Sequence, residues 1–215
     1  IGDFVFYDHN GNGVFNPNGV DNLPGTNDDE TGVADATVQL IVDSNGDGKA
    51  GAYEPVYAIT STNASGFYLF RNLPPGRYVA KVEDQSVAAP PSSDNAGLVG
   101  FMLSTSGEQV PVNLAPGQAF LAADYGFIEK AVIEGYVFHD EDSSSLRDPS
   151  ESGIAAVAVR VAGTDYKSNP VDLTVDTDST GRYFFLVPPG SYTLSYNTSD
   201  PDIPTGLVRA TTPVS

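Results

Sequence analysis

One segment combines side-chain types and spacing that suit the binding of a hard divalent cation. Residues 43–54 read Asp-Ser-Asn-Gly-Asp-Gly-Lys-Ala-Gly-Ala-Tyr-Glu and satisfy the calcium-loop pattern D-x-[DN]-x-[DN]-G-x5-E. When such a loop curls, oxygens at positions 1, 3 and 5 converge, glycine at position 6 permits the sharp turn, and the carboxylate at position 12 closes the shell. The predicted ligands are Asp43, Asn45, Asp47, the backbone carbonyl of Lys49 and Glu54. The alternative interpretation is a plain hairpin turn rich in Asp and Asn.

A second loop carries the first half of this pattern. Its predicted ligands are Asp8, Asn10, Asn12 and the backbone carbonyl of Val14. Position 12 falls on Gly19, so the closing carboxylate must come from elsewhere. The insertion that follows offers four candidates, namely Asp21, Asp28, Asp29 and Glu30. A solvated Asn-Gly turn is the alternative.

The third loop spans residues 140–151. Oxygen-bearing groups stand at positions 1, 3, 5, 7, 9 and 12 of the pattern, from Asp140, Asp142, Ser144, the carbonyl of Leu146, Asp148 and Glu151. Position 6 is Ser145 where the pattern has glycine, which predicts a strained or differently shaped turn. An acidic surface loop is the alternative. A fourth acidic segment, 176–181, is predicted to be an ordinary hairpin turn, because the matching segment at 62–66 lacks both of its acids.

The composition limits the partners and the setting. With 28 Asp and Glu against 10 Lys and Arg, the formal net charge is −18. Such a field repels nucleic acid and anionic membranes and attracts divalent cations. The chain has no cysteine, so no disulfide can add rigidity, and bound metal is one substitute. No apolar run is long enough to span a membrane and no signal peptide is present, so we expect a mature product or a fragment.

The elements that position these loops belong to a unit that occurs twice. The paired segments, in the same order in both halves, are 1–8 with 133–140, 32–40 with 153–161, 66–70 with 181–185, and 73–78 with 187–192. The repeat predicts two domains, 1–130 and 131–215, the second incomplete at its C-terminal end. Leu207-Val208 match Leu98-Val99, so copy two lacks partners for 109–113 and 119–128. Either the chain was cut there or another chain supplies the closing strand.

Short runs with alternating hydrophobicity predict the strands. Apolar residues share one face in each run: Val38, Leu40 and Val42; Tyr78, Ala80 and Val82; Val157, Val159 and Val161; Tyr192, Leu194 and Tyr196. Each run is bounded by Gly, Pro or Asn, and one-sided alternation is typical of antiparallel sheets with one buried face. The predicted fold is therefore all-β, with two tandem antiparallel β-sandwiches of transthyretin- or immunoglobulin-like type.

Catalysis has little support in the sequence. The chain has two histidines, His9 and His139, and no G-x-S-x-G nucleophile motif. Carboxylate, amide and carbonyl oxygens suit calcium better than softer metals. We therefore expect a binding or structural protein and not an enzyme.

Four motifs occur in order along copy one. They are Ile-Gly-Asp-Phe-Val-Phe-Tyr-Asp running into an Asn-Gly loop, then Gly-Phe-Tyr-Leu-Phe, Leu-Pro-Pro-Gly-Arg-Tyr and Asp-Tyr-Gly-Phe. Together they resemble the calcium-binding B domains of serine-aspartate repeat (SdrD B-like) adhesins, which are related to the collagen-adhesin B-type (Cna-B) modules. The resemblance covers nearly all of copy one and most of copy two. It implies calcium as cofactor and a stalk of tandem modules at a bacterial cell surface. Some relatives carry a Lys–Asn cross-link, but no lysine lies in either opening strand, so we expect none here.

The expected partners are neighbouring repeats or subunits of the same protein and a host or matrix ligand, with no nucleic acid and no direct membrane insertion. Two other functions remain open. One is a subunit of an extracellular filament or sheath assembled by strand exchange between chains. The other is a carbohydrate-binding accessory module that uses exposed Tyr53, Tyr57 or Tyr166.

Overall fold

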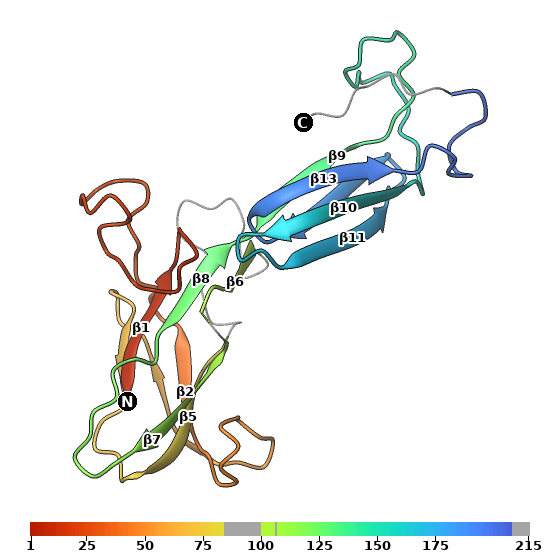
Figure 1. Ribbon diagram of the computed structural model, residues 1–215. Coiled ribbons are helices and arrows are strands. Elements are labelled where there is room, and N and C mark those ends of the chain that lie inside the picture. Colours follow the sequence, from red (N-terminus) through yellow and green to blue (C-terminus); the bar gives the residue numbers. More distant parts are fainter. Residues whose placement is uncertain (84–99, 106, 208–215) are drawn as a thin grey trace. The chain divides into compact units, whose positions relative to one another are not determined.

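The computed structural model describes residues 1–83, 100–105 and 107–207, and it divides into two compact units (Figure 1). Unit 1 is Ile1–Glu129 and unit 2 is Lys130–Ser215. The elements named among the described residues are all strands. These residues contain no helix that is long and apolar enough to cross a membrane. The prediction of an all-β chain is confirmed. Leu98, Val99 and Val208, which supported one of the repeat matches, lie outside the described residues.

Unit 1 is built from two four-stranded sheets. The first has the order β4-β1-β8-β6, from β4 (Phe67–Leu69), β1 (Gly2–Tyr7), β8 (Tyr125–Glu129) and β6 (Phe101–Leu103). The second has the order β3-β2-β5-β7, from β3 (Val56–Ser61), β2 (Thr37–Val42), β5 (Gly76–Val82) and β7 (Gln109–Leu114). The pairings are antiparallel as expected, with one exception. Strand β8 runs parallel to β1, with Val5 opposite Tyr125 and Tyr7 opposite Phe127.

The core of unit 1 follows from the alternation along its strands. Val38 and Leu40 of β2 and the alternate residues Tyr78, Ala80 and Val82 of β5 are buried. Their side chains pack with aromatic residues of the opposite sheet, including Tyr68, Tyr125 and Phe127. Burying each such large apolar side chain stabilises the fold by about 1.5–3 kcal/mol. The sheets therefore hold the loops at their ends on a rigid support.

Unit 2 repeats this plan with fewer strands among its described residues. One sheet pairs β12 (Arg182–Val187) with β9 (Ala131–Tyr136). The other has the order β11-β10-β13, from β11 (Pro170–Asp176), β10 (Ala158–Asp165) and β13 (Gly190–Tyr196). Strands β9 to β13 correspond in sequence to β1 to β5. The described part of unit 2 contains no counterpart of β6, β7 or β8.

The repeat extends to single buried hydrogen bonds. The Thr62 hydroxyl donates to the Val33 carbonyl at 2.6 Å and accepts the Ala36 N–H at 2.9 Å. In unit 2 the Thr177 hydroxyl donates to Ile154 at 2.7 Å and accepts from Val157 at 3.0 Å. Both copies thus use a buried threonine to bridge the segment before β2 or β10, because buried backbone groups there need partners.

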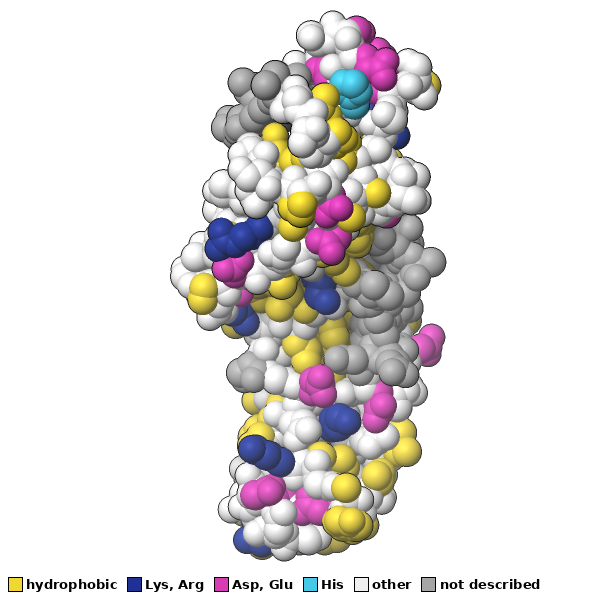
Figure 2. Space-filling view, turned by 90° about the vertical axis from the view of Figure 1, so that its right-hand side faces the viewer, with side chains coloured by type: hydrophobic (Ala, Val, Ile, Leu, Met, Phe, Trp, Pro, Cys, Tyr) yellow, Lys and Arg dark blue, Asp and Glu magenta, His cyan; other side chains and the backbone are white. Residues whose placement is uncertain are grey.

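The acids are spread over the face of the molecule that Figure 2 draws. On the face drawn in Figure 2, Asp and Glu side chains lie in several separate groups, with Lys and Arg side chains between them. The acids that are buried are few among the described residues, and they are Asp8, Glu30, Asp43 and Glu151. All four belong to the three loops that the sequence singles out.

Candidate metal-binding loops

The three candidate loops each follow a strand, two of them directly and the third after three further residues. We call them the β1 loop (residues 8–30), the β2 loop (43–54) and the β9 loop (140–151). The β1 and β2 loops lie at opposite ends of unit 1 (Figure 1). The β2 loop joins β2 to β3, so the calcium-loop pattern stands here between two strands. The ends of β1 and β2 fix the first residues of their loops, Asp8 and Asp43, and the rest of each loop curls around that residue.

The aspartate at position 1 organises each loop. Asp8, fully buried, accepts the backbone N–H groups of Gly11 at 2.8 Å and Gly13 at 2.7 Å. Asp43 does the same for Gly46 at 2.6 Å and Gly48 at 3.2 Å. These four glycines have φ between 72° and 79°, the left-handed conformation that lets successive N–H groups point inward.

The β9 loop keeps this shape without glycine. Asp140 accepts the N–H groups of Ser144 and Ser145, both at 3.1 Å. Ser143 and Ser145 take φ values of 62° and 64°, so serine occupies the left-handed region where the other loops have glycine. The sequence predicts either a strained turn or a turn of different shape. The turn keeps the shape of the other loops and is strained, because in the left-handed conformation the Cβ atom of serine crowds the following carbonyl oxygen.

A glutamate closes the β2 and β9 loops in the same way. Glu54 accepts the N–H groups of Ser44 at 2.7 Å and Gly51 at 3.0 Å, at positions 2 and 9. These bonds, led by the one from Gly51, lower the pKa of the Glu54 carboxyl. Glu151 accepts from Glu141 and from Asp148, both at 2.9 Å and at the same two positions. Each carboxylate therefore returns to the start of its own loop.

Glu30 takes this place in the β1 loop. Its carboxylate accepts the N–H of Asn16 at 2.7 Å and the side-chain amide of Asn10 at 3.1 Å. Asn16 stands at position 9, the position that Gly51 and Asp148 hold in the other loops. The insertion therefore separates the closing glutamate from the rest of its loop in sequence, but the fold places its carboxylate beside the loop.

The other three acids of the insertion accept hydrogen bonds from backbone groups of the insertion itself. Asp28 accepts the N–H of Val20 at 2.6 Å, and Asp29 accepts that of Gly25 at 2.5 Å. Asp21 accepts the N–H of Leu23 at 2.8 Å. Among these candidates, the structure thus brings only Glu30 to the ligand positions of the loop.

A signal for Glu30 was present in the sequence. The repeat match that begins at Gly32-Val33 and Gly153-Ile154 extends two residues toward the N-terminus, to Glu30 and Glu151. Counting from the start of the calcium pattern misses this glutamate, since the insertion shifts it. Counting back from the following Gly finds it in both copies.

In the β1 loop, burial and mutual repulsion disfavour two charged carboxylates, those of Asp8 and Glu30, without a cation between them. Glu30 is 2% exposed. Burial, followed by the nearby Asp8, raises the pKa of Glu30 to about 7. A cation bound between these two groups would remove the repulsion and offset the desolvation. The oxygen-only donor set is the chemistry that calcium prefers, so the residues present fit the ion that the resemblance implies.

The remaining predicted ligands lie around these carboxylates. Asp140, Asp142 and Glu151 bring carboxylate oxygens within 4.8 Å of one another, the only group of three acidic, His or Cys side chains so close in the described residues. The three acids of the β2 loop do not meet that distance, and Asn45 donates instead to Asp47 at 3.1 Å. The side-chain oxygens of Asn10, Asn12, Asn45, Asp47, Asp142 and Ser144 each accept an N–H two residues ahead. The position-7 residues are Val14, Lys49 and Leu146, which are exposed.

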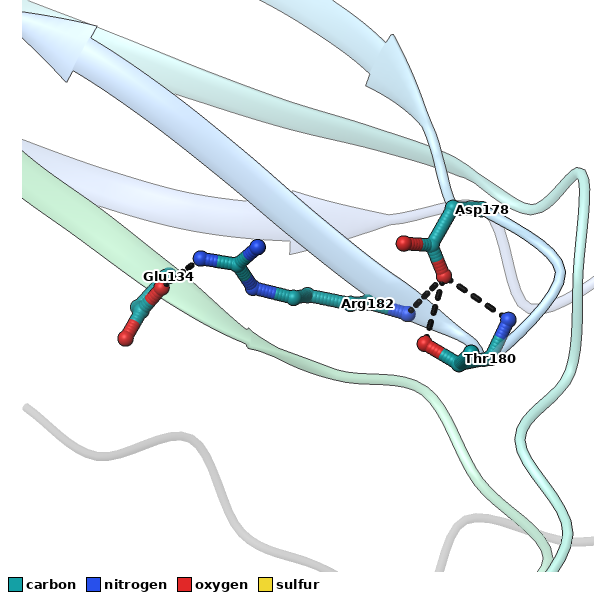
Figure 3. Close-up of polar contacts among 4 residues, drawn as sticks. All are labelled: Glu134, Asp178, Thr180 and Arg182. Atoms are coloured by element: carbon teal, nitrogen blue, oxygen red, sulfur yellow. Dashed lines mark hydrogen bonds and ion pairs between the residues drawn. The ribbon is translucent and has the colours of Figure 1, made fainter.

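The fourth acidic segment is a turn, as predicted, but it is not a hairpin. Strands β11 and β12, which it connects, belong to different sheets. Asp178 accepts the N–H groups of Thr180 at 2.8 Å and Arg182 at 3.0 Å, together with the Thr180 hydroxyl at 2.7 Å (Figure 3). Arg182 pairs across to Glu134 on β9. The bonds of Asp178 stay within the turn and the start of β12, and Arg182 ties β12 to β9, so the segment has a structural role.

Comparison with known proteins identifies the unit that is repeated. A family model described as SdrD B-like domain matches residues 1–127 and again residues 131–212. Serine-aspartate repeat-containing protein D of Staphylococcus aureus (strain Newman) is 30% identical over 211 residues, covering 95% of this chain and 14% of that protein. Colossin-A of Dictyostelium discoideum is 27% identical over 224 residues, covering 98% of this chain and 2% of that protein. The chain thus spans a small part of these relatives.

Two of the solved structures with distant similarity are pilins. A streptococcal ancillary pilin has 14% identity and a TM-score of 0.35, with 99% of this chain and 57% of that chain covered. GBS52, a minor pilin of Streptococcus agalactiae, has 14% identity and a TM-score of 0.34, with 93% and 84% covered. These TM-scores are too low to support a structural comparison, so the assignment rests on the family model. Because that model matches twice and together spans nearly every residue, this chain belongs to the SdrD B-like domain family and carries two copies of the domain.

Proposed function

We propose that this chain is a non-enzymatic structural segment of an extracellular protein, and that calcium in the β1, β2 and β9 loops stiffens it. The observation that carries the proposal is the position of Glu30. A buried carboxylate with a pKa raised to about 7 lies next to buried Asp8, at the place where Glu54 and Glu151 close the other loops. Such a pair is costly without a cation. An aspartate at position 1 and a closing glutamate also recur in unit 2, as Asp140 and Glu151, which favours a shared purpose.

The residues that would hold the ion are oxygen donors in every loop. They are Asp8, Asn10, Asn12, the Val14 carbonyl and Glu30 in the β1 loop; Asp43, Asn45, Asp47, the Lys49 carbonyl and Glu54 in the β2 loop; and Asp140, Asp142, Ser144, the Leu146 carbonyl and Glu151 in the β9 loop. A bound calcium supplies two positive charges that neutralise the acids and join the two ends of each loop. The donors contain no sulfur or imidazole, which disfavours zinc.

Stiffening follows from where the loop ends are attached. Asp8 directly follows β1, and its N–H donates to Phe127 of β8 at 2.8 Å. Just after Glu30, the N–H of Val33 donates to the Val5 carbonyl of β1 at 2.8 Å. An ion held by both Asp8 and Glu30 would therefore clamp the insertion to the sheet, and metal binding would be linked to folding.

The setting we propose is a stalk at the cell surface or in a secreted protein. Family membership, tandem repetition and the net charge of −18 support it. Neighbouring repeats or subunits would be the partners, and any host ligand would bind elsewhere in the longer protein. We assign no catalytic role to the two histidines, which lie in different units, His9 in a loop and His139 3.7 Å from Glu141.

Calorimetric titration of the metal-free chain with calcium tests the proposal. We expect saturable binding with one site per loop, and loss of one site in each of the variants Asp8→Asn, Asp43→Asn and Asp140→Asn. Asp172→Asn, which removes an acid paired with Arg160 outside all loops, is the matched control. No saturable binding up to about 10 mM calcium, well above the range of extracellular sites, would rule the proposal out.

A second candidate function is a subunit that assembles by strand exchange. It is favoured by the edges of β9 and β13, which pair with no further strand in the described part of unit 2. Unpaired edges accept strands from other chains. If the chain remains monomeric in sedimentation over a wide concentration range, this candidate fails while the calcium proposal stands.

A further inference from the structure

The residue at position 8 of the β1 loop joins this loop to the sheet beside it. The ring of Phe15 packs on that of Phe4, with centroids 4.9 Å apart, and on that of Phe6, at 5.2 Å. Both partners belong to β1, and Phe4 also meets Phe67 of β4 edge to face at 5.4 Å. Phe6 is fully buried although it points away from the core between the sheets, since successive side chains of a strand face opposite sides. Phe15 thus helps to cover the outer face of this sheet.

The β9 loop makes the corresponding contact with a different side chain. Its position 8 is Arg147, whose guanidinium lies over the ring of Tyr136 on β9, 4.2 Å from the ring centroid. Tyr136 matches Phe4 in the repeat, so Arg147 on Tyr136 replaces Phe15 on Phe4. Both contacts are attractive, one between two aromatic rings and the other between a cation and a ring. The pairing is therefore retained although the chemistry of one partner differs.

The β2 loop is joined to its sheet at the same position through its backbone. Ala50, at position 8, donates its N–H to the side-chain carbonyl of Gln109 on β7 at 2.8 Å. Here the strand supplies the long side chain and the loop supplies the donor. In each of the three loops, position 8 thus contacts a strand of its own unit, a recurrence that spacing within the loop alone does not require.

Position 8 lies between two groups that an ion would hold in place. In the β1 loop, the preceding residue is Val14, whose carbonyl is a ligand in the calcium-loop pattern. The following residue is Asn16, whose N–H donates to the Glu30 carboxylate at 2.7 Å. An ion bound by the Val14 carbonyl and by Glu30 would fix the backbone on both sides of Phe15. Its ring would then be held against β1.

We propose that position 8 transmits calcium binding from each loop to its sheet, through Phe15 to β1, Ala50 to β7 and Arg147 to β9. The inference rests on the proposed calcium binding and adds a connection in the middle of each loop to those at the loop ends. An ion that only neutralised acids would order the loop alone, whereas the contact at position 8 extends this order to a strand. In unit 1, the outer face of β1 stays covered while calcium is bound and opens more often when calcium is removed.

Amide hydrogen exchange of the full chain, in saturating calcium and in chelator, tests this transmission. In the wild type, calcium should slow exchange on β1 by about fivefold or more. In Phe15→Ala, which keeps every oxygen donor, calcium should still bind but should slow exchange on β1 by less than about twofold. Phe15→Tyr keeps a ring and should retain the wild-type effect.

The matched control is Leu23→Ala, which removes an exposed apolar side chain from the same insertion and should behave as the wild type. A merely structural Phe15 would speed exchange equally in calcium and in chelator, so the ratio of the two rates would not change. Arg147 is exposed, so Arg147→Ala leaves unit 2 folded and provides a second test. It should remove the calcium-dependent slowing on β9, and Arg147→Phe should keep it.

Calorimetric titration of the same samples with calcium separates the two ways of failing. If calcium binds and slows exchange on β1 equally in the wild type and in Phe15→Ala, position 8 is not the connection, and the proposed calcium binding stands. Calcium binding that leaves exchange on β1 of the wild type unchanged would overturn the inference in the same way. If the wild type binds no calcium, the proposed function fails and the inference fails with it.

Discussion

The Glu30 carboxylate accepts the backbone N–H of Asn16 at 2.7 Å, although fourteen positions separate them. In unit 2, Glu151 accepts the N–H of Asp148 at 2.9 Å across three positions. The two pairs occupy the same places in their loops, so the insertion lengthens the path of the chain and preserves the acceptor. A shared geometry on different chain lengths indicates that the carboxylate itself is what the loop requires.

Replacement of this carboxylate should weaken calcium binding by the β1 loop. In Glu30→Gln the side chain can still accept one hydrogen bond but carries no charge, so we expect the affinity of this site to fall about tenfold or more. Calorimetric titration measures the change. Asp21→Asn, which removes a charge from the exposed part of the same insertion, is the control and should change affinity little. Equal losses in the two variants would indicate a general charge effect.

The metal-free chain should lose stability as the pH rises from about 5 to 7. Between the unfolded pKa near 4.5 and the folded pKa of about 7, the folded state keeps the Glu30 proton and the unfolded state releases it. The raised pKa of Asp3 and Asp124, caused chiefly by burial, acts in the same direction. The loss should be at most about 3 kcal/mol in the free energy of unfolding.

Urea unfolding of the chain in chelator, at several pH values, measures this trend. In Glu30→Gln the slope over the same window should flatten, because the main titrating group is gone. Saturating calcium should also abolish it, since a cation favours the charged carboxylate. A wild-type stability that rises with pH in chelator would contradict the burial of Glu30.

The buried threonines should contribute equally in the two units. Thr62→Val and Thr177→Val leave one N–H and one carbonyl without their partner, so each should destabilise its unit by about 1–3 kcal/mol. The exposed Thr174→Val on β11 should change the free energy of unfolding by less than about 0.5 kcal/mol. Denaturant midpoints of the three variants test this. A neutral Thr177→Val would show that unit 2 is not packed there as unit 1 is.

A glycine at position 6 of the β9 loop should increase the stability of unit 2. Ser145 has φ of 64°, so Ser145→Gly relieves backbone strain that exceeds the added chain entropy of glycine. We expect unit 2 to be stabilised by about 0.5–1 kcal/mol in chelator. Ser144→Gly is the opposite control, because Ser144 donates to the Leu146 carbonyl at 3.1 Å and that bond is lost. Stabilisation by both variants would point to loop flexibility instead.

Much of the fold could be predicted from local patterns. Alternation along Val38 and Leu40, and the four repeated segments, suffice for the strands and for the tandem arrangement. The parallel pairing of β1 with β8 could not be predicted, because it joins Val5 to Tyr125 across the whole of unit 1 and no local signal encodes direction.

For the candidate sites too, local features could be predicted from the sequence and distant contacts could not. The position-1 aspartates and their left-handed turns follow from spacing within a few residues, and Asp8 and Asp43 accept the N–H groups of Gly11 and Gly46 in those turns. Glu30 could not be chosen among four acids by spacing from Asp8, because an insertion has no fixed path. Buried Val33, which follows Glu30 closely in sequence, is a better reference point for finding the closing glutamate than the start of the loop.

Scanning calorimetry of the whole chain with calcium and with excess chelator tests the central claim most directly. If calcium clamps the loops to the sheets, the melting temperature should fall by about 5 °C or more on chelation, in a transition that calcium restores. Superimposable melting curves in calcium and in chelator would contradict the claim that these loops bind the ion and stabilise the fold.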